Sequence, residues 1–598
     1  MTFDLDDVKY TKYKKPSRTT QFVAILRNRR YLAILAIATI VLVWYLSPFL
    51  RSSDSQVLQD STQQQSNKDP FKDYRPPEPQ APPAGNRPDL DQQVPIVPQP
   101  GTVSEQSEDA YFLFTQHPPP QKLRPDDAKT ALRQKRIVEA FQHAWRGYAA
   151  DAFGMDEYQP LSQTGRNWAP GGIGLMIVDA LDTMLLMNLT EEYEAARDWV
   201  ATRLDFDKQQ DVNVFETTIR VLGGLLSAYH LSGGDSIYLE KAQDLGNRLV
   251  GAFNTESGIP YPSVTLSTGL PFKFHSTSST AEATTIQLEF KYLSHLTGDY
   301  KYWDVAERVM LKMKQLVDNG ETVDGLVPIL MNPVTGLFVT QEIRLGSRGD
   351  SYYEYLIKQY LQTDKTEPLY RDMYDHTVQG IRKHLLGRSF PNNLLYIGEV
   401  QQSRLDVLSP KMDHLVCFIG GTFAIGATQG LKLTDKPLMT QSHIDDLDMG
   451  KDITRTCYEM YNTTATGLAS EIVYFSTKPD SQSDILIKPL DKHNLLRPET
   501  MESLFVLWRI TGDPIYREWG WNIFEAFEKH TKLPVGGYAA LKDVTRVPAP
   551  KDDRMDTFFL AETLKYLYLL FSPDDLIPLD KYVFNSEAHP LPIFRPAK

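Results

Sequence analysis

The chain has 598 residues, a net charge of −13, 41% hydrophobic residues and only two cysteines, Cys417 and Cys457. This hydrophobic content is enough for a large folded core, whereas the negative charge argues against general nucleic-acid binding, which needs a basic surface. Two cysteines exclude a disulfide-rich scaffold and a four-cysteine zinc site, and they allow one disulfide in an oxidising compartment.

An uncharged apolar segment lies near the N-terminus, at residues 31–50 (YLAILAIATIVLVWYLSPFL). About 20 such residues are needed to cross a bilayer as a helix. Basic residues precede the segment and acidic residues soon follow it, which predicts residues 1–30 as a cytosolic tail and the rest of the chain as lumenal. The alternative is a cleaved signal peptide, but the apolar run is long for one and no small-residue cleavage site stands out. We therefore predict a single-pass type II membrane protein.

Residues 51–125 are rich in Gln, Ser, Asp and Pro. Such a composition cannot bury enough apolar surface to order itself. We predict a disordered stem that holds the following domain away from the membrane.

Residues 126–598 have the texture of a helical domain, with amphipathic periodicity as far as about Phe571 and few convincing strands. A weak repeat recurs at Asp235, Asp299 and Asp513: an apolar helix, a Gly-Asp turn, and a Tyr three residues later that starts the next helix. Glycine suits a helix C-terminus and Asp suits the next N-cap. Repeated helical hairpins indicate a solenoid or a closed α-toroid, with an irregular helical domain as the alternative.

Two N-glycosylation sequons, Asn188-Leu-Thr190 and Asn462-Thr-Thr464, occur within this domain. Such triplets also arise by chance. They therefore give mild support to a lumenal location.

Acidic residues gather at the expected starts of helices. Glu216 precedes a long apolar helix with Arg220 four residues on, Asp350 and Glu354 are four apart, and Glu499 and Glu502 are three apart. Further acids of this kind are Glu471, Asp556 and Glu562.

Each of these acids also has a structural explanation. Ser351 and Glu354 fit a capping box, and a first-turn acid such as Glu499 complements the helix dipole. Arginines and aromatic residues crowd the same turns, however, which is typical of sugar sites, and glycoside hydrolysis uses two carboxylates. If the hairpins close into a toroid, the acids can converge on one cavity, where calcium is the natural cation.

Other catalytic classes have little support. No His/Cys cluster has zinc spacing, and neither a nucleophilic serine elbow nor a phosphate-binding glycine loop stands out in the sequence.

Several segments resemble the class I α-1,2-mannosidases, glycoside hydrolase family 47, from about Ile137 to Phe594. They are VDALDTMLLM, VFETTIRVLGGLLSAYHLS, GDSYYEYLIKQY, HLVCFIGGTFAIGA, LLRPETMES, FFLAETLKYLYLLF and VFNSEAHPLPI. The resemblance implies an all-α (αα)7 barrel closed by a C-terminal β-hairpin. It also implies calcium-dependent, inverting hydrolysis of terminal α-1,2-linked mannose from high-mannose N-glycans of the Man9GlcNAc2 type.

The resemblance assigns roles to individual residues. Glu216 matches the proton donor, Glu499 the general base, and Asp350 and Glu471 two further catalytic acids. The substrate-binding positions are Arg220, Arg348, Asp182, Glu354, Glu502, Asp556 and Glu587. Ser586 matches the calcium ligand, and Cys417 and Cys457 match the family's disulfide.

Two departures from the family pattern stand out. Ser586 replaces a threonine, which keeps the hydroxyl and carbonyl oxygens but loses the methyl group that fixes the rotamer. Asp556 replaces a glutamate, and the shorter side chain could shift a cavity carboxylate by about 1 Å. GLASE, which ends at Glu471, also lacks the usual proline. These departures motivate an alternative: a catalytically weakened glycan-binding paralogue in glycoprotein quality control or degradation.

The expected setting is the ER or Golgi membrane, with a monomeric lumenal catalytic domain that meets high-mannose N-glycans on glycoproteins. The sequence does not decide between ER and Golgi. It also does not decide which mannose branch is cleaved first.

Overall fold

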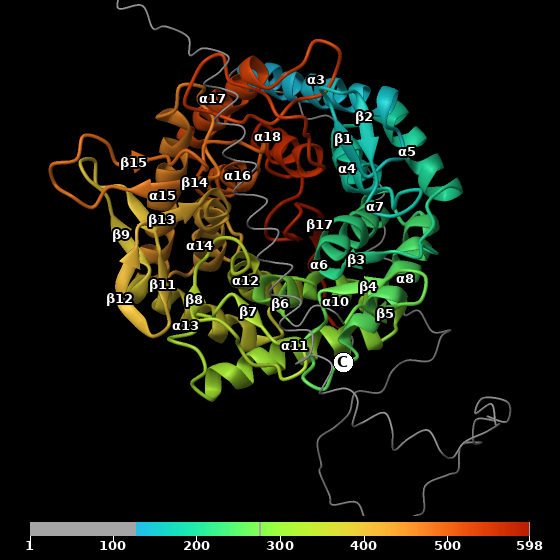
Figure 1. Ribbon diagram of the computed structural model, residues 1–598, viewed down its shortest axis with the longest axis horizontal. Helices are drawn as coiled ribbons and strands as arrows, with labels where there is room; N and C mark the ends of the chain where they lie inside the picture. The colour runs from blue at the N-terminus through green and yellow to red at the C-terminus, as the bar shows by residue number, and fades with distance from the viewer. Residues whose placement is uncertain (1–126, 274–276, 597–598) are drawn as a thin grey trace, which may run out of the picture. The chain divides into compact units, whose positions relative to one another are not determined.

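The computed structural model describes residues 127–273 and 277–596. These residues form a helical barrel in which long helices stand in an inner and an outer layer (Figure 1). The cytosolic tail, the membrane span and the stem that the sequence predicts lie outside the described residues.

The inner layer is a closed ring. Each inner helix packs against the next one along the chain, and the last, with η5, packs against α16 on one side and α4 on the other. The side chains of these helices are buried almost all round; in α14, for example, every residue is buried. The inner elements are α4 (Leu175–Leu186), α6 (Val214–Glu216), the π-helix η1 (Thr217–Leu222), α7 (Gly223–Leu231), α10 (Gln287–Thr297), α12 (Asp350–Gln362), α14 (Ile419–Thr428), α16 (Glu499–Thr511), the π-helix η5 (Phe559–Thr563) and α18 (Leu564–Leu570).

The outer layer consists of amphipathic helices that pack on the inner ring, and some of them contact two neighbouring inner helices, as α15 contacts α14 and α16. In α11, residues such as Tyr302, Val305, Val309 and Met313 are buried at helical spacing while charged residues face outward. The outer helices are α3 (Asp127–Asp151), α5 (Thr190–Thr202), α8 (Ser236–Leu249), α11 (Lys301–Asp318), α13 (Pro368–His384), α15 (Gln441–Asn462) and α17 (Ile515–His530).

The repeated Gly-Asp turns join inner to outer helices, as the sequence predicts. Gly298 ends α10 in the left-handed conformation (φ 70°), and the Asp299 carboxylate accepts a hydrogen bond from the backbone N–H of Lys301 at 3.1 Å. Gly512 and Asp513 repeat this arrangement between α16 and α17. The hairpins close into a ring, so the toroid is confirmed over the open solenoid and the irregular domain.

A C-terminal β-hairpin occupies the centre of the ring (Figure 1). Its strands β16 (Tyr582–Phe584) and β17 (Pro590–Pro592) pair antiparallel and pack on α12 and α7. The Tyr582 hydroxyl lies 3.1 Å from Nε2 of His230 near the C-terminal end of α7. The hairpin therefore enters from the end at which the inner helices finish.

The remaining strands and helices are short and lie in the connections. The strands are β1 (Glu157–Gln159), β2 (Thr164–Arg166), β3 (Asp211–Asn213), β4 (Ser263–Thr265), β5 (Leu270–Pro271), β6 (Ser278–Ser279), β7 (Leu330–Met331), β8 (Glu342–Ile343), β9 (Leu386–Arg388), β10 (Leu395–Ile397), β11 (Glu399–Gln401), β12 (Arg404–Ser409), β13 (Lys411–Asp413), β14 (Ile472–Phe475) and β15 (Ile485–Leu486). The helices are η2 (Val250–Phe253), α9 (Thr280–Thr284), η3 (His414–Phe418) and η4 (Leu433–Asp435).

Helices α14 and α15 approach closely, and the disulfide Cys417–Cys457 joins η3, which directly precedes α14, to α15. This disulfide confirms the predicted pair. A Cβ atom on Gly450 would lie 2.7 Å from the carbonyl oxygen of Gly420, so glycine is required at this contact. Residues His414–Asp435, which include α14, are apolar enough for a membrane span, but 78% of that stretch is buried inside the barrel. Burial in the core accounts for this hydropathy.

Replacing both cysteines with alanine should lower the free energy of unfolding by about 3–4 kcal/mol, because the disulfide closes a long loop in the unfolded chain. The two cysteines are 40 residues apart. Thermal unfolding under non-reducing conditions measures the effect, with the reduced wild-type protein as the control. Equal melting temperatures for the variant and the oxidised wild type would contradict a stabilising disulfide.

Candidate active site

The predicted acids meet at one end of the barrel because the inner helices all run in the same direction. An outer helix returns the chain between successive inner helices, so the inner N-termini lie together. Glu216 ends the short helix α6, Asp350 begins α12 and Glu499 begins α16. Each of the three is only partly buried. This end of the barrel is therefore the candidate site.

Glu499 is held as a carboxylate. His414 Nδ1 lies 2.8 Å from Oε2 of Glu499, and an Arg497 Nη1 lies 4.0 Å from Oε1. Burial alone would raise the pKa of Glu499, but the hydrogen bond to His414 and the charges of His414 and Arg497 outweigh it and lower the pKa. The other ring nitrogen of His414 lies 2.7 Å from the Tyr461 hydroxyl, which fixes the ring. The Glu499 carboxylate can accept a proton.

Asp350 has the opposite environment. Burial, together with the nearby charges of Glu354, Glu499 and Asp413, raises its pKa to about 7, although the backbone N–H of Ser351 donates to it at 2.8 Å. A protonated Asp350 can donate a proton near neutral pH. One ionised and one protonated carboxyl in the same region are typical of an acid–base pair.

Glu471 comes from the loop before β14 rather than from a helix. Arg497 Nε lies 2.5 Å from Oε2 of Glu471, and the same guanidinium approaches Glu499. Arg497 thus links the two acids. Its guanidinium also lies over the ring of Phe558, at 5.5 Å from the centroid.

Arg220 is the main cation on the opposite side of the site. Its Nε lies 2.8 Å from Oε2 of Glu216, one residue before the π-helix η1 in which Arg220 sits. The same side chain forms an ion pair with Glu587 and donates to the Thr557 hydroxyl at 3.0 Å. Arg220 therefore joins the helix start to the turn of the C-terminal hairpin.

A deeper group surrounds Lys358, whose ammonium pairs with Glu354 and lies 3.2 Å from Glu502. Burial, with the charges of Glu354 and Glu499, raises the pKa of Glu502 to about 7 against the opposing effect of Lys358. The Ser586 hydroxyl donates to Glu354 at 3.1 Å. Carboxylates outnumber cations here, which favours a bound cation or retained protons.

The hairpin turn is held by a fully buried charge cluster. His589 Nδ1 lies 2.7 Å from Asp182, and its Nε2 lies 3.0 Å from Asp179; both carboxylates belong to α4. Because a carboxylate only accepts, both ring nitrogens donate and the ring is an imidazolium. Burial would lower the pKa of His589, but these carboxylates outweigh it and raise the pKa. Lys565 completes the cluster at 2.8 Å from Asp182.

The oxygen donors around Ser586 fit a hard cation such as calcium. Ser586 offers its hydroxyl and carbonyl oxygens, and Glu354 lies within hydrogen-bond distance of the hydroxyl. Among residues 127–273 and 277–596, no three His, Cys, Asp or Glu side chains converge closely enough to bind a metal by themselves. A cation at this turn would therefore be held by Ser586 and by water that the surrounding carboxylates orient.

The other predicted residues lie around these groups. Arg348 is exposed next to Asp350, and Asp556 pairs with Arg554 at 2.7 Å. Asp182 is fully buried, and its carboxylate contacts Lys565, Ser227 and His589. The capping box suggested for Ser351 and Glu354 does not form, because α12 already begins at Asp350 and Glu354 pairs with Lys358.

Sequence reasoning missed three residues of the site. Lys358 stands four residues after Glu354, a spacing that predicts an ion pair on a helix. His589 lies in the segment that carries Ser586, but nothing in the sequence indicates its two aspartate partners. His414 begins η3 and lies 85 residues before its partner Glu499, so no local sequence pattern indicates the contact.

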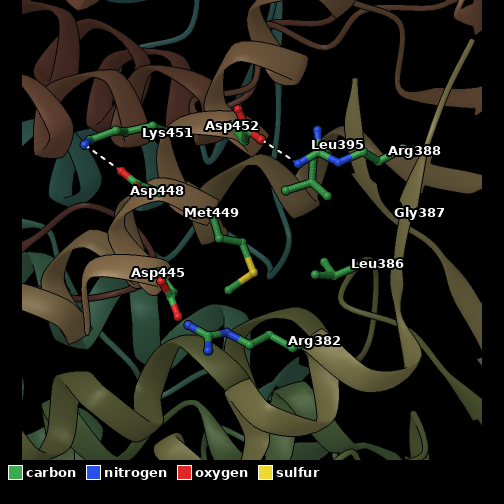
Figure 2. A pocket seen from close by; sticks show the side chains of 10 residues that line it. All are labelled: Arg382, Leu386, Gly387, Arg388, Leu395, Asp445, Asp448, Met449, Lys451 and Asp452. Atoms are coloured by element: carbon green, nitrogen blue, oxygen red, sulfur yellow. Dashed lines mark hydrogen bonds and ion pairs between the residues drawn. The ribbon is translucent and has the colours of Figure 1, made fainter. Parts of the chain in front are cut away.

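Figure 2 shows a separate hollow of about 730 Å³ between the end of α13, strand β9 and helix α15. Its charged side chains pair with one another: Lys451 with Asp448 at 2.9 Å, and Arg388 with Asp452 at 2.8 Å. None of the predicted site residues lines it.

Known proteins resemble this chain in sequence and in fold. The sequence profile of glycosyl hydrolase family 47 matches residues 140–593. The chain is 50% identical to the mannosyl-oligosaccharide 1,2-alpha-mannosidase MNS3 of Arabidopsis thaliana, over 78% of this chain and 80% of that protein. It is 45% identical to the human endoplasmic reticulum mannosyl-oligosaccharide 1,2-alpha-mannosidase, over 91% of this chain and 75% of that protein. The solved α-1,2-mannosidase of Trichoderma reesei superposes with a TM-score of 0.70 at 28% identity, covering 77% of this chain and 99% of that one.

Replacing His589 with glutamine should destabilise the protein by about 3–5 kcal/mol, because it leaves a buried carboxylate without its partner. The pKa of His589 is raised in the folded state, so its contribution is full below the unfolded value of about 6.5 and is lost as pH rises through the folded value. Melting temperatures of wild type and variant should therefore differ most at low pH.

The matched control is His376→Gln on the exposed face of α13, which should leave the melting temperature unchanged. A pH-independent difference between wild type and His589→Gln would show that His589 is not a buried imidazolium.

Proposed function

The chain belongs to glycosyl hydrolase family 47, and from this we propose that it hydrolyses terminal α-1,2-linked mannose from high-mannose N-glycans with inversion. The observation that carries the proposal is the convergence of Glu216, Asp350 and Glu499 at one partly open end of the barrel, where the pKa of Glu499 is lowered and that of Asp350 is raised to about 7. An inverting glycosidase needs a base that activates water and an acid on the other side of the bond.

In the proposed reaction, Glu499 removes a proton from the attacking water while His414 and Arg497 hold its carboxylate in place. Glu216 stands at the opposite side, tied to Arg220, and supplies the proton to the leaving sugar oxygen as the family resemblance implies. Asp350 and Glu471 complete the acidic lining. The exposed Arg348 beside Asp350 suits contact with sugar hydroxyls.

We propose that the deeper acids and the hairpin turn bind calcium and do not take part in proton transfer. We assign Ser586 as the direct calcium ligand, with Glu354, Glu502 and Glu587 orienting its water shell. Calcium would supply positive charge beneath the sugar ring, where carboxylates otherwise outnumber cations. Asp182 supports the turn through His589 and so acts on the site indirectly.

The proposed setting is the endoplasmic reticulum, with residues 31–50 as the membrane anchor and the (αα)7 barrel, a monomer, in the lumen. Relatives from human and Saccharomyces cerevisiae are named as endoplasmic reticulum enzymes. The buried disulfide also favours an oxidising compartment.

The alternative is a glycan-binding protein with weakened catalysis. It is favoured by Asp556, whose carboxylate already accepts two hydrogen bonds from Nε of Arg554, at 2.7 and 2.9 Å. A glutamate there would reach one methylene further into the site. Binding of a high-mannose glycan without mannose release, together with activity gained in Asp556→Glu, would favour this alternative.

Glu499→Gln should lower kcat by about 10²–10⁴-fold, the usual contribution of a general base. The amide is isosteric, so affinity for Man9GlcNAc2 should stay close to that of the wild type. Mannose release and calorimetric glycan binding measure the two effects separately. Glu525→Gln, on the outer helix α17 with 54% of its side chain exposed, is the matched control and should be silent. Equal loss of turnover and binding in Glu499→Gln would argue for a structural role instead.

Ser586→Ala should weaken calcium binding by about 10-fold or more, because it removes one of two ligand oxygens, whereas Ser586→Thr should bind at least as well as the wild type. The readout is the rise in melting temperature with calcium concentration, which reports ligand affinity for the folded state. Identical calcium titrations for all three proteins, or no shift with calcium at all, would place the ion elsewhere or exclude it.

A further inference from the structure

The two sequons remain outside the catalytic account, and the structure shows the asparagine of each to be exposed. Thr190 is exposed as well, whereas Thr464 is half-buried and its hydroxyl donates to the carbonyl of Leu468 at 2.9 Å. The full sequence contains two Asn-X-Ser/Thr triplets, at Asn188 and Asn462. Asn188 and Thr190 are exposed while Leu189 between them is buried. Asn462 is also exposed.

Asn188 lies in the turn between α4 and α5. Its backbone is left-handed (φ 55°), a conformation that asparagine tolerates better than most residues. Thr190 is the first residue of α5. The three residues therefore form a surface turn in which both polar side chains of the triplet are accessible.

Asn462 is the last residue of α15. Its amide donates to the carboxylate of Glu459 at 3.1 Å on the exposed helix face. The preceding residue, Tyr461, is buried and contacts His414, the partner of Glu499. Asn462 thus lies at the barrel end that holds the acids, whereas Asn188 follows the C-terminus of an inner helix and lies at the other end.

From this placement we infer that Asn188 and Asn462 both carry N-linked oligosaccharides. The inference rests on the lumenal location in the proposed function, which the Cys417–Cys457 disulfide also supports. The two glycans lie at opposite ends of the barrel. At Asn462 the buried Tyr461 contacts His414, while the asparagine itself is exposed to solvent.

The modification is a transfer from an oligosaccharide diphospholipid. The amide nitrogen of asparagine attacks C1 of the first sugar and forms the N–C1 bond. The C1–O bond to the diphosphate breaks, the diphospholipid leaves with the bonding electrons, and the amide nitrogen loses one proton to a base of the transferring enzyme. The hydroxyl of the third triplet residue is required for recognition.

The test is expression of the full chain in a eukaryotic secretory system, followed by peptide mass spectrometry before and after peptide-N-glycosidase in ¹⁸O water. Release of each glycan converts its asparagine to an isotopically marked aspartate. Marking at both Asn188 and Asn462 is expected. An unmarked position in the wild-type protein overturns the assignment of that site.

Matched variants distinguish the effect of losing a sequon from the effect of changing a neighbouring side chain. Thr190→Ala removes the first sequon without changing the left-handed Asn188, and Thr190→Ser retains it. Asn462→Gln removes the second sequon, and Glu459→Ala removes only the hydrogen-bond partner. Each sequon-breaking variant should lose one glycan and each control should keep both; loss in a control would overturn the assignment at that site.

Mannose release measured on the same preparations keeps the two proposals apart. An active enzyme without glycans contradicts this inference alone. A doubly glycosylated protein that releases no mannose contradicts the proposed activity alone.

Discussion

Each carboxylate inside the barrel must be offset by a cation, a proton or a bound ion, because an unpaired buried charge is costly. Arg220 offsets Glu216 and Glu587, and Lys358 offsets Glu354 and Glu502. These cations do not suffice, because burial still raises the pKa values of Asp350 and Glu502, the latter against the opposing charge of Lys358. This shortage of positive charge favours a cation and a neutral, hydroxyl-rich ligand in the same cavity.

The topology of the fold explains why carboxylates outnumber cations inside the barrel. Parallel inner helices bring their N-termini to one end, where Glu216, Asp350 and Glu499 lie in the first turns of α6, α12 and α16. A helix tolerates an acid well in its first turn. The C-terminal hairpin fills the other end and reaches up to Glu354 with Ser586 and to Arg220 with Glu587. His589 fixes this turn to α4 through Asp179 and Asp182. The C-terminal end of the chain is therefore held in place by the first inner helix.

The sequence predicts the helical hairpins well, since the Gly-Asp turns at Asp299 and Asp513 are local signals that the structure reproduces. Local periodicity could not predict whether the hairpins form a closed ring or an open solenoid. The resemblance to a known family was needed to predict the closed barrel. The acids Glu216, Asp350 and Glu499 were predictable from their places at helix starts. Their partners were not: His414 contacts Glu499 across 85 residues of sequence, and such long-range pairs leave no local pattern.

The stereochemistry of the first product tests the central claim most directly. ¹H NMR can follow Man9GlcNAc2 hydrolysis and identify the anomer of mannose before it mutarotates. Attack by a water that Glu499 activates, opposite the acid side of the cavity, predicts β-mannose as the first product. Initial release of α-mannose would mean a covalent intermediate instead, and would contradict the roles given to these carboxylates.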